Sequence, residues 1–104
     1  MIVKHTLFLG LNDKDSKIQE INTLDAYKIT MRLISSVGYE GASITESTGF
    51  YTHESGDFVI EKSLKIEILF ADNEKTNRLI EDLKKTFNQE SIALQIQKIN
   101  SKLV

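Results

Sequence analysis

The chain has no cysteine and no proline among its 104 residues, and only five glycines. Without cysteine it cannot form disulfides, which fits a reducing cytosol, and we expect a cytoplasmic protein. The lack of proline and the few glycines exclude a linker or a low-complexity segment. A chain of this length is typical of one domain, so we expect a single domain over residues 1–104.

A basic face and a long apolar run are also missing. The chain carries 13 Lys and Arg against 15 Asp and Glu, for a net charge of −2, and its densest basic cluster, Lys84-Lys85 with Arg78, is interrupted by acidic residues. Nucleic-acid binding, which needs a basic surface, is therefore not expected. No apolar run approaches the roughly 20 residues that span a bilayer. The first five residues lead into a strand-like run without a signal-peptide pattern, so we expect no membrane partner.

The most informative stretch runs from Ile44 to Phe70 and predicts two long strands joined at Glu54-Ser55-Gly56-Asp57. In the second strand apolar residues occupy even positions and mostly polar residues occupy odd ones. A period of two places one face of a strand on a core and the other toward water or a partner. The apolar row consists of Phe58, Ile60, Leu64, Ile66, Ile68 and Phe70.

Two helices and two further strands are predicted around this pair. Residues 2–11 and 91–99 alternate as strands do. Thr23 is expected to cap a first helix that ends at Gly38, and Asp72 or Asn73 to cap a second helix. The apolar stripe of the first helix comprises Leu24, Tyr27, Met31 and Ile34, and that of the second comprises Leu79, Ile80, Leu83 and Phe87.

The order strand, helix, strand, strand, helix, strand predicts an α+β fold, the ferredoxin-like βαββαβ plait. In this fold two helices cover one face of a four-stranded antiparallel sheet. Right-handed crossovers place the first and third strands in the centre. Those two strands are also the most apolar runs of the chain, so composition and topology agree.

The predicted hairpin is longer than the helices that would cover it. Strands of ten or more residues reach about 33 Å, whereas helices of roughly 15 residues span about 22 Å. The outer half of the hairpin should therefore project from the body and expose large side chains, among them Tyr51 and Phe58. Such side chains are costly in water unless another subunit covers them. We expect a homo-oligomer, a dimer or a trimer; the alternative is a monomer whose hairpin curls back over its own sheet.

Four pieces of the sequence resemble a small bacterial family classed as a domain of unknown function. They are Thr6–Leu11, Gly49-Phe50-Tyr51, Glu61-Lys62-Ser63 and Phe87-Asn88-Gln89-Glu90-Ser91-Ile92. The Phe-x-Gln-Glu-Ser element of the last piece is the most specific. This resemblance supports the fold and implies no activity.

More remotely, Val37–Ser43, Gly49-Phe50-Tyr51 and Ser63–Ile68 resemble the PII signalling proteins and the CutA group. The resemblance implies a trimer of this plait in which the hairpin or the clefts between subunits act in signalling. PII proteins hold nucleotide phosphate with a glycine-rich loop before the last strand. Here that junction has no glycine and carries Glu90, which would repel a phosphate. We therefore expect neither nucleotide binding in the PII manner nor any other cofactor.

The hairpin tip supplies the first candidate site residues. His53 and Glu54 are adjacent there, and Asp57 lies across the turn. Imidazole and carboxylate suit zinc or copper, but a site needs three or four convergent ligands, so no metal is expected. His5 alternates with apolar residues, and we interpret it as a partly buried strand histidine.

Carboxylates supply the second set of candidates. Glu61 and Glu67 lie on the strand face turned away from the helices, where plait enzymes such as haem-free monooxygenases and small isomerases keep their sites. Either glutamate could act as a general base. Gln89, Glu90 and Ser91 either bind a ligand or partner, or hold the helix end by side-chain hydrogen bonds.

Two functions follow from these patterns. The first is a PII-like regulatory or binding module without catalytic activity, which presents Tyr51, His53, Glu54 and Phe58 to a protein or a small molecule. The alternative is a small ferredoxin-like enzyme with Glu61 or Glu67 as its base. The sequence favours the first, because no catalytic triad and no phosphate-binding loop are visible.

Overall fold

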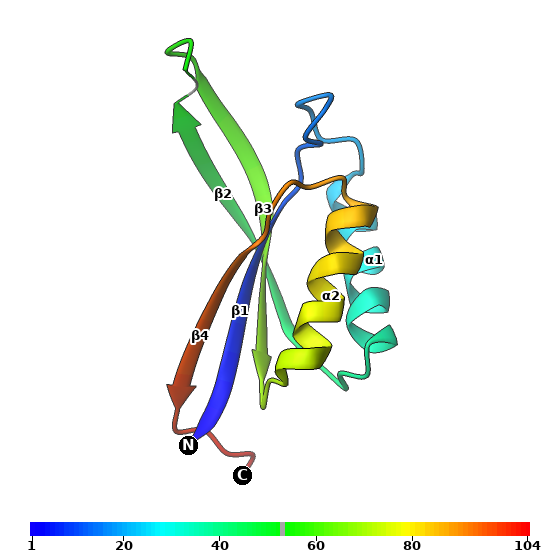
Figure 1. The fold of residues 1–104 in the computed structure, drawn as a ribbon, viewed down its shortest axis with the longest axis vertical. Helices are drawn as coiled ribbons and strands as arrows, with labels where there is room; N and C mark the ends of the chain where they lie inside the picture. Colours follow the sequence, from blue (N-terminus) through cyan, green and yellow to red (C-terminus); the bar gives the residue numbers. More distant parts are fainter. Residues whose placement is uncertain (53) are drawn as a thin grey trace.

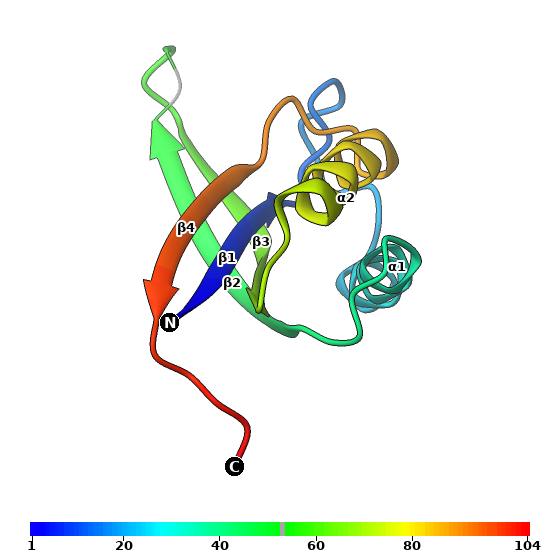
Figure 2. The ribbon, with the colours of Figure 1, turned by 60° about the horizontal axis from the view of Figure 1, so that its bottom comes forward.

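The fold is described here from a computed structural model that covers residues 1–52 and 54–104. A four-stranded antiparallel sheet carries two helices on one face, as Figures 1 and 2 show. The elements are β1 (Ile2–Gly10), α1 (Thr23–Ser36), β2 (Ser43–Thr52), β3 (Phe58–Leu69), α2 (Asn73–Thr86) and β4 (Ala93–Ile99). The sheet order β2-β3-β1-β4 confirms the ferredoxin-like plait, with the two apolar strands in the centre.

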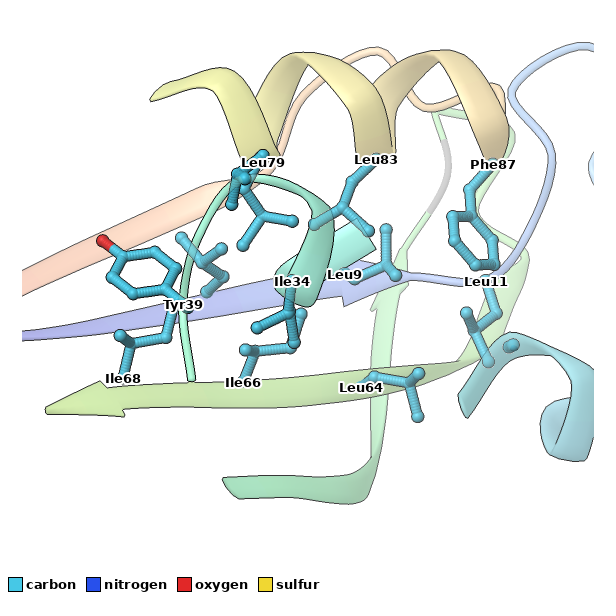
Figure 3. Packing of buried hydrophobic residues seen from close by; sticks show 13 residues of the cluster. Leu9, Leu11, Ile34, Tyr39, Leu64, Ile66, Ile68, Leu79, Leu83 and Phe87 are labelled. Atoms are coloured by element: carbon cyan, nitrogen blue, oxygen red, sulfur yellow. The ribbon is translucent and has the colours of Figure 1, made fainter. Parts of the chain in front are cut away.

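The core lies between the two central strands and the helices. β1 and β3 pair so that Leu7 is opposite Ile66 and Leu9 is opposite Leu64, and all four side chains are fully buried. In Figure 3 the side chains of Leu79 and Leu83 on α2, and of Phe87 at its C-cap, point toward the labelled residues of these two strands. The alternate apolar side chains of β3 and the apolar side chains spaced by three to four residues in α2 therefore pack in one apolar layer.

The helix caps follow the sequence closely, with one correction. The N-cap of α1 is Asn22, whose side chain accepts the Asp25 N–H at 2.9 Å; it is not Thr23, which is the first helical residue. Both residue types cap well, so the sequence alone leaves a one-residue ambiguity. Asp72 caps α2 as expected, and Gly38, with φ +102°, follows the end of α1 in the left-handed conformation that glycine tolerates.

The predicted stripe of α1 is confirmed for Ile34, which is buried, and for Tyr27, which packs against the core, and is wrong for Leu24 and Met31. Leu24 and Met31 are exposed, at 64% and 53%, whereas the buried residues are Ala26, Thr30 and Ile34. Positions four residues apart share a helix face, and Thr30 occupies this face in place of an apolar residue. Threonine contributes a methyl group as valine does, so counting only apolar residues misplaced the face.

The β2–β3 hairpin projects beyond the helices, as predicted (Figure 1). Its strands have 10 and 12 residues, against 14 residues in each helix, and the molecule measures 48 × 24 × 22 Å. Phe50, Phe58 and Ile60 on the outer half are more than 70% exposed. β3 ends at Leu69, one residue earlier than expected, because Phe70 has φ +53° and leaves the strand.

One end of the sheet gathers three connections. The hairpin, the loop that follows β1 and the α2–β4 junction lie at the same end, and both termini lie at the other (Figure 1). Within the described residues, no helix has the length and apolar character needed to cross a membrane. The three connections are the segments from which the site described below is built.

Candidate functional site

A pocket of about 420 Å³ opens at the end of the sheet where these connections meet. We name it the Glu61 pocket. It is lined by Phe8, Gly10, Asn12, Lys14, Lys17, Tyr51, Glu61, Ser63, Gln89, Glu90 and Ser91. Ser63 is opposite Gly10 in the sheet, and the neighbouring Leu9 and Leu64 face the core. The pocket therefore lies on the sheet face turned away from the helices.

Glu61 is the central group of this pocket. Its side chain is half-buried, and its Oε2 accepts a hydrogen bond from the backbone N–H of Asn12 at 2.9 Å. The carboxylate lies over Gly10 so closely that a Cβ on that residue would be 2.8 Å from all three carboxyl atoms. Glycine within a strand often marks such a close approach. Gly10 and Asn12 thus fix where the charge of Glu61 lies.

Gln89 holds the carbonyl group of the same residue, Asn12. Its Nε2 donates to the carbonyl oxygen of Asn12 at 2.5 Å and to that of Phe87 at 3.3 Å. Asn12 is thereby hydrogen-bonded through both its N–H and its C=O, to Glu61 and to Gln89 respectively. The Phe-x-Gln-Glu-Ser element is consequently connected to the carboxylate through one backbone residue.

Asn88 fixes the loop after β1 against the α2–β4 junction. Its side-chain amide donates to both carboxylate oxygens of Asp13 at 3.0 Å and to the carboxylate of Asp15 at 2.8 Å. Its backbone carbonyl accepts a hydrogen bond from the Lys14 N–H at 3.0 Å. The backbone N–H of Ser16, the Asn88 amide and other nearby donors hold the pKa of Asp13 below its usual value. The loop is therefore attached by several polar contacts rather than by apolar packing.

Charges of both signs line the pocket. Glu61 and Glu90 contribute carboxylates, and Lys14 and Lys17 of the loop contribute ammonium groups. Ser63, Ser91 and Tyr51 add hydroxyl groups, and Phe8 adds an aromatic surface. A concave site with an aromatic wall and a few converging polar groups is typical of small-molecule binding.

The structure brings together most of the site residues expected from the sequence. Tyr51, Glu61, Gln89, Glu90 and Ser91 line the one pocket, although they come from three separate segments. Whether they act in binding or catalysis stays a prediction.

The remaining candidates lie elsewhere. Phe58 is on the opposite face of the hairpin, where its ring meets that of Phe50 at 6.1 Å between centroids. Glu67 pairs with Lys4 and Lys65, and the Lys4 ammonium holds its pKa below the usual value. Glu54 is exposed at the hairpin turn, and His53 is outside the described residues. Among the residues described, no group of three or more acids and histidines is arranged to hold a metal.

Four pocket residues were not foreseen: Gly10, Asn12, Lys14 and Lys17. A glycine near the end of an apolar strand was the one local signal, because it permits a neighbouring side chain to lie over the backbone. The lysines gave no signal, since their place depends on the contact between Asn88 and Asp13, which are 75 residues apart.

A second hollow, of about 570 Å³, lies near the start of β2 but offers fewer uncommitted polar groups. Its acid Glu67 is already ion-paired. Its base Lys75 donates to the Gly38 carbonyl at 3.3 Å and lies 5.5 Å from the centre of the Tyr39 ring. We therefore regard the Glu61 pocket as the candidate site.

Solved structures with this fold include an enzyme. A phage SAM lyase in complex with S-methyl-5′-thioadenosine is 29% identical over 93% of this chain and 81% of that chain, with a TM-score of 0.71. CutA from Synechococcus elongatus PCC7942 is 11% identical over 94% of this chain and 77% of that chain, with a TM-score of 0.61. CutA from Pyrococcus horikoshii is 18% identical, covers 99% and 88% of the two chains, and has a TM-score of 0.56. The CutA structures support the fold alone.

No curated protein matches the sequence. The family described as "Protein of unknown function (DUF3574)" matches residues 4–102. That range contains both helices and all four strands, apart from the first two residues of β1. It also contains every residue of the Glu61 pocket. The chain therefore belongs to the DUF3574 family of proteins of unknown function.

Proposed function

We propose that the Glu61 pocket binds S-adenosylmethionine and cleaves it, releasing S-methyl-5′-thioadenosine. The observation that carries this proposal is the Glu61 carboxylate, half-buried over Gly10 and fixed by the Asn12 N–H at 2.9 Å. A fixed anion of this kind suits a substrate with a positive sulfur, because opposite charges attract more strongly where water is partly excluded. The likeness to a phage SAM lyase at 29% identity supports the same substrate class.

The chemistry needs only one base. Release of S-methyl-5′-thioadenosine breaks the bond between sulfur and Cγ of the methionine part, and the electron pair stays on sulfur, which becomes neutral. Glu61 takes a proton from Cβ, and the electrons of that C–H bond form the double bond between Cβ and Cγ. The products are the thioether, an unsaturated amino acid and a protonated Glu61, which returns its proton to water. No metal or redox partner is needed for this balance.

The pocket has the features that such a ligand requires. Its volume of about 420 Å³ lies within the roughly 300–1,000 Å³ typical of small-molecule sites. Phe8 offers an apolar surface for an adenine ring, and Ser63 offers a hydroxyl group for the ribose. Oε1 of Glu61 has no hydrogen-bond partner within the described residues, so it is available to the substrate.

The test is incubation of the purified protein with S-adenosylmethionine, followed by mass spectrometry of the products. Glu61→Gln keeps the shape of the side chain and removes the charge, and we expect it to lower product formation by about 100-fold or more, the usual effect of removing a general base. Glu46→Gln is the matched control. Glu46 lies on the same hairpin, beside Lys62 and away from the pocket, and the variant should keep full activity.

The outcomes separate three functions. S-methyl-5′-thioadenosine together with an unsaturated amino acid supports the elimination. S-methyl-5′-thioadenosine together with a lactone means that the substrate's own carboxylate attacks Cγ and that Glu61 acts through its charge. Binding without product supports the regulatory or binding module expected from the sequence, and neither binding nor product refutes the proposal.

A second proposal concerns assembly. We propose that the exposed hairpin patch, defined as Phe50, Phe58 and Ile60, contacts a second copy of the chain. These residues are 74%, 74% and 71% exposed and share the hairpin face on the helix side, beyond the helices. An apolar patch of this kind is costly in water. A homo-oligomer, dimer or trimer, would cover the patch and could place a neighbour beside the Glu61 pocket.

A further inference from the structure

The loop that follows β1 is a tight turn with a fixed place at the mouth of the Glu61 pocket. Asp13 and Ile18 are joined by a backbone hydrogen bond of 2.8 Å, and the Lys17 N–H donates to the Asp13 carbonyl at 2.9 Å. Asn88 then attaches this turn to the α2–β4 junction through the Asp13 carboxylate and the Lys14 N–H. The side chains of Lys14 and Lys17 are therefore carried by a backbone held at both ends.

Lys17 has a backbone conformation that lysine rarely adopts. Its φ is +66°, in the left-handed region where glycine and asparagine are favoured and other residues are strained. A turn needs no lysine at such a position, and asparagine or glycine would serve the fold better. Strained residues cluster at sites where the side chain has a function. Lys17 is one of the residues that line the Glu61 pocket.

The two lysines give the pocket positive as well as negative charge. Lys14 and Lys17 belong to the loop after β1, whereas Glu61 belongs to β3 and Glu90 to the α2–β4 junction. Within the part of the chain that is described, neither lysine forms an ion pair. The nearby carboxylates of Asp13 and Asp15 accept hydrogen bonds from the Asn88 side-chain amide, and the charge of Lys14 also acts on Asp13.

We propose that Lys17, assisted by Lys14, binds the carboxylate of the amino-acid end of the ligand and so determines specificity. The pocket would then select adenosyl compounds that carry an amino acid over those that do not. An ammonium group that meets a carboxylate in a partly buried site forms a charge-assisted hydrogen bond. This inference rests on the proposed function, because it assumes an adenosyl ligand whose sulfur end faces Glu61.

The experiment uses titration calorimetry with two compounds that the protein cannot cleave at the sulfonium, since neither contains one. S-adenosylhomocysteine carries the amino-acid end, and S-methyl-5′-thioadenosine lacks it. Lys17→Asn removes the charge with a residue that suits a positive φ. We expect it to weaken S-adenosylhomocysteine binding by about ten-fold or more, the scale of one charge-assisted hydrogen bond. Binding of S-methyl-5′-thioadenosine should change by less than about two-fold, because that compound has no group for Lys17.

Controls separate the charge from the fold. Lys17→Arg keeps a cation at the same strained position and should retain S-adenosylhomocysteine binding. The melting temperature of Lys17→Asn should equal or exceed that of the natural protein, because asparagine relieves the strain. Equal losses for both compounds, no loss for either, or a loss in Lys17→Arg as large as in Lys17→Asn would overturn this inference while leaving the proposed function intact. If the natural protein binds neither compound, this inference fails, and the proposed function fails with it only if S-adenosylmethionine is neither bound nor cleaved.

Discussion

The carboxylate of Glu61 occupies the space that a side chain on Gly10 would need. A Cβ at position 10 would be 2.8 Å from the carboxyl carbon and from both oxygens, a separation that real Cβ atoms essentially never show. The two residues belong to neighbouring central strands, and the absence of a side chain on one determines the place of the charge on the other. This relationship makes Gly10 part of the candidate site although it has no functional group.

Gly10→Ala should therefore displace the Glu61 carboxylate and break its hydrogen bond to the Asn12 N–H. We expect a small loss of stability, of about 1 kcal/mol for the lost hydrogen bond, because the displaced atoms are the far end of a flexible side chain. Product formation from S-adenosylmethionine should fall about ten-fold or more. Chemical denaturation and mass spectrometry of the products measure the two effects. Gly49→Ala is the matched control. Gly49 of β2 pairs with Glu61 in the sheet, but nothing would lie within 4 Å of a Cβ at position 49. Equal effects of the two substitutions would contradict the role of Gly10.

Gln89→Leu should make the position of the Glu61 carboxylate less fixed, although the side chain of Gln89 is bonded to Asn12 and not to Glu61. The substitution removes the donor to the Asn12 carbonyl, so the residue whose N–H binds Glu61 loses its second attachment. We expect faster hydrogen exchange at the Asn12 amide and a stability loss of about 1 kcal/mol, the usual net value of one hydrogen bond. If the pocket is catalytic, kcat should fall more than KM rises, since the base is misplaced.

The control for this prediction is Gln97→Leu, which replaces an exposed glutamine on β4. It should leave both the exchange rate and the kinetics unchanged. An Asn12 amide that remains protected in Gln89→Leu would show that the loop is held by the Asn88 contacts alone.

Phe50→Ser combined with Phe58→Ser should abolish self-association. The rings of these residues contact each other on the exposed hairpin patch, with 65° between their planes. We expect the natural protein to have two or three times the chain mass of 11.8 kDa, and the double variant to have that of one chain. Light scattering measures both. Leu24→Ser removes an exposed leucine from α1 and should leave the mass unchanged. A natural protein that is monomeric would refute the assembly proposal.

The fold was predictable because its signals are local. The alternation along β3 and the spacing of Leu79, Leu83 and Phe87 each identify one element and its buried face, and chirality then leaves few arrangements. The stripe of α1 was misassigned because Thr30 is fully buried with its polar side chain. Whether a threonine presents its methyl group to a core depends on the partner surface, which local periodicity does not contain.

The site was predictable only in part, for the same reason. Tyr51 stood out on the projecting hairpin, Glu61 on the open sheet face, and Gln89 through the Phe-x-Gln-Glu-Ser element. The sheet register carries Tyr51 and Glu61 to the end of the molecule where Gln89 lies. The place of Lys17 depends on the amide of Asn88, which belongs to a distant segment. Contacts of this kind connect loops through polar groups and leave no periodic pattern in the sequence.

His5 is the residue through which pH should affect stability. It is buried, and its Nδ1 lies 2.8 Å from the hydroxyl of Thr76, which lies 2.7 Å from the hydroxyl of Tyr39. Tyr39 donates its proton to the Asp72 carbonyl, so Thr76 must donate to Tyr39 and His5 Nδ1 must donate to Thr76. Nε2 is then an unprotonated nitrogen, buried without a hydrogen-bond partner among the described residues.

Protonation of His5 would place a positive charge at Nε2, where neither water nor a hydrogen-bond acceptor among the described residues stabilises it. Burial therefore holds the pKa of His5 below its usual value of 6.5, and the Asp72 carboxylate offsets only part of this effect. Between the lowered pKa and 6.5 the unfolded chain binds more protons than the folded one. Stability should be complete above pH 6.5 and should decrease as pH falls through this window, by up to about 1.4 kcal/mol per pH unit.

Denaturation of the natural protein and of His5→Asn between pH 7.5 and 5 measures this effect. Asparagine keeps a donor for Thr76 and cannot titrate, so the variant should be less stable at pH 7.5 but should lose much less stability on acidification. The lowered pKa values of Asp13 and Glu67 affect stability only as pH falls toward and below their usual values of 3.8 and 4.5, outside this range. Parallel pH profiles for the two proteins would show that His5 titrates equally in the folded and the unfolded chain and that the buried Nε2 has no energetic consequence.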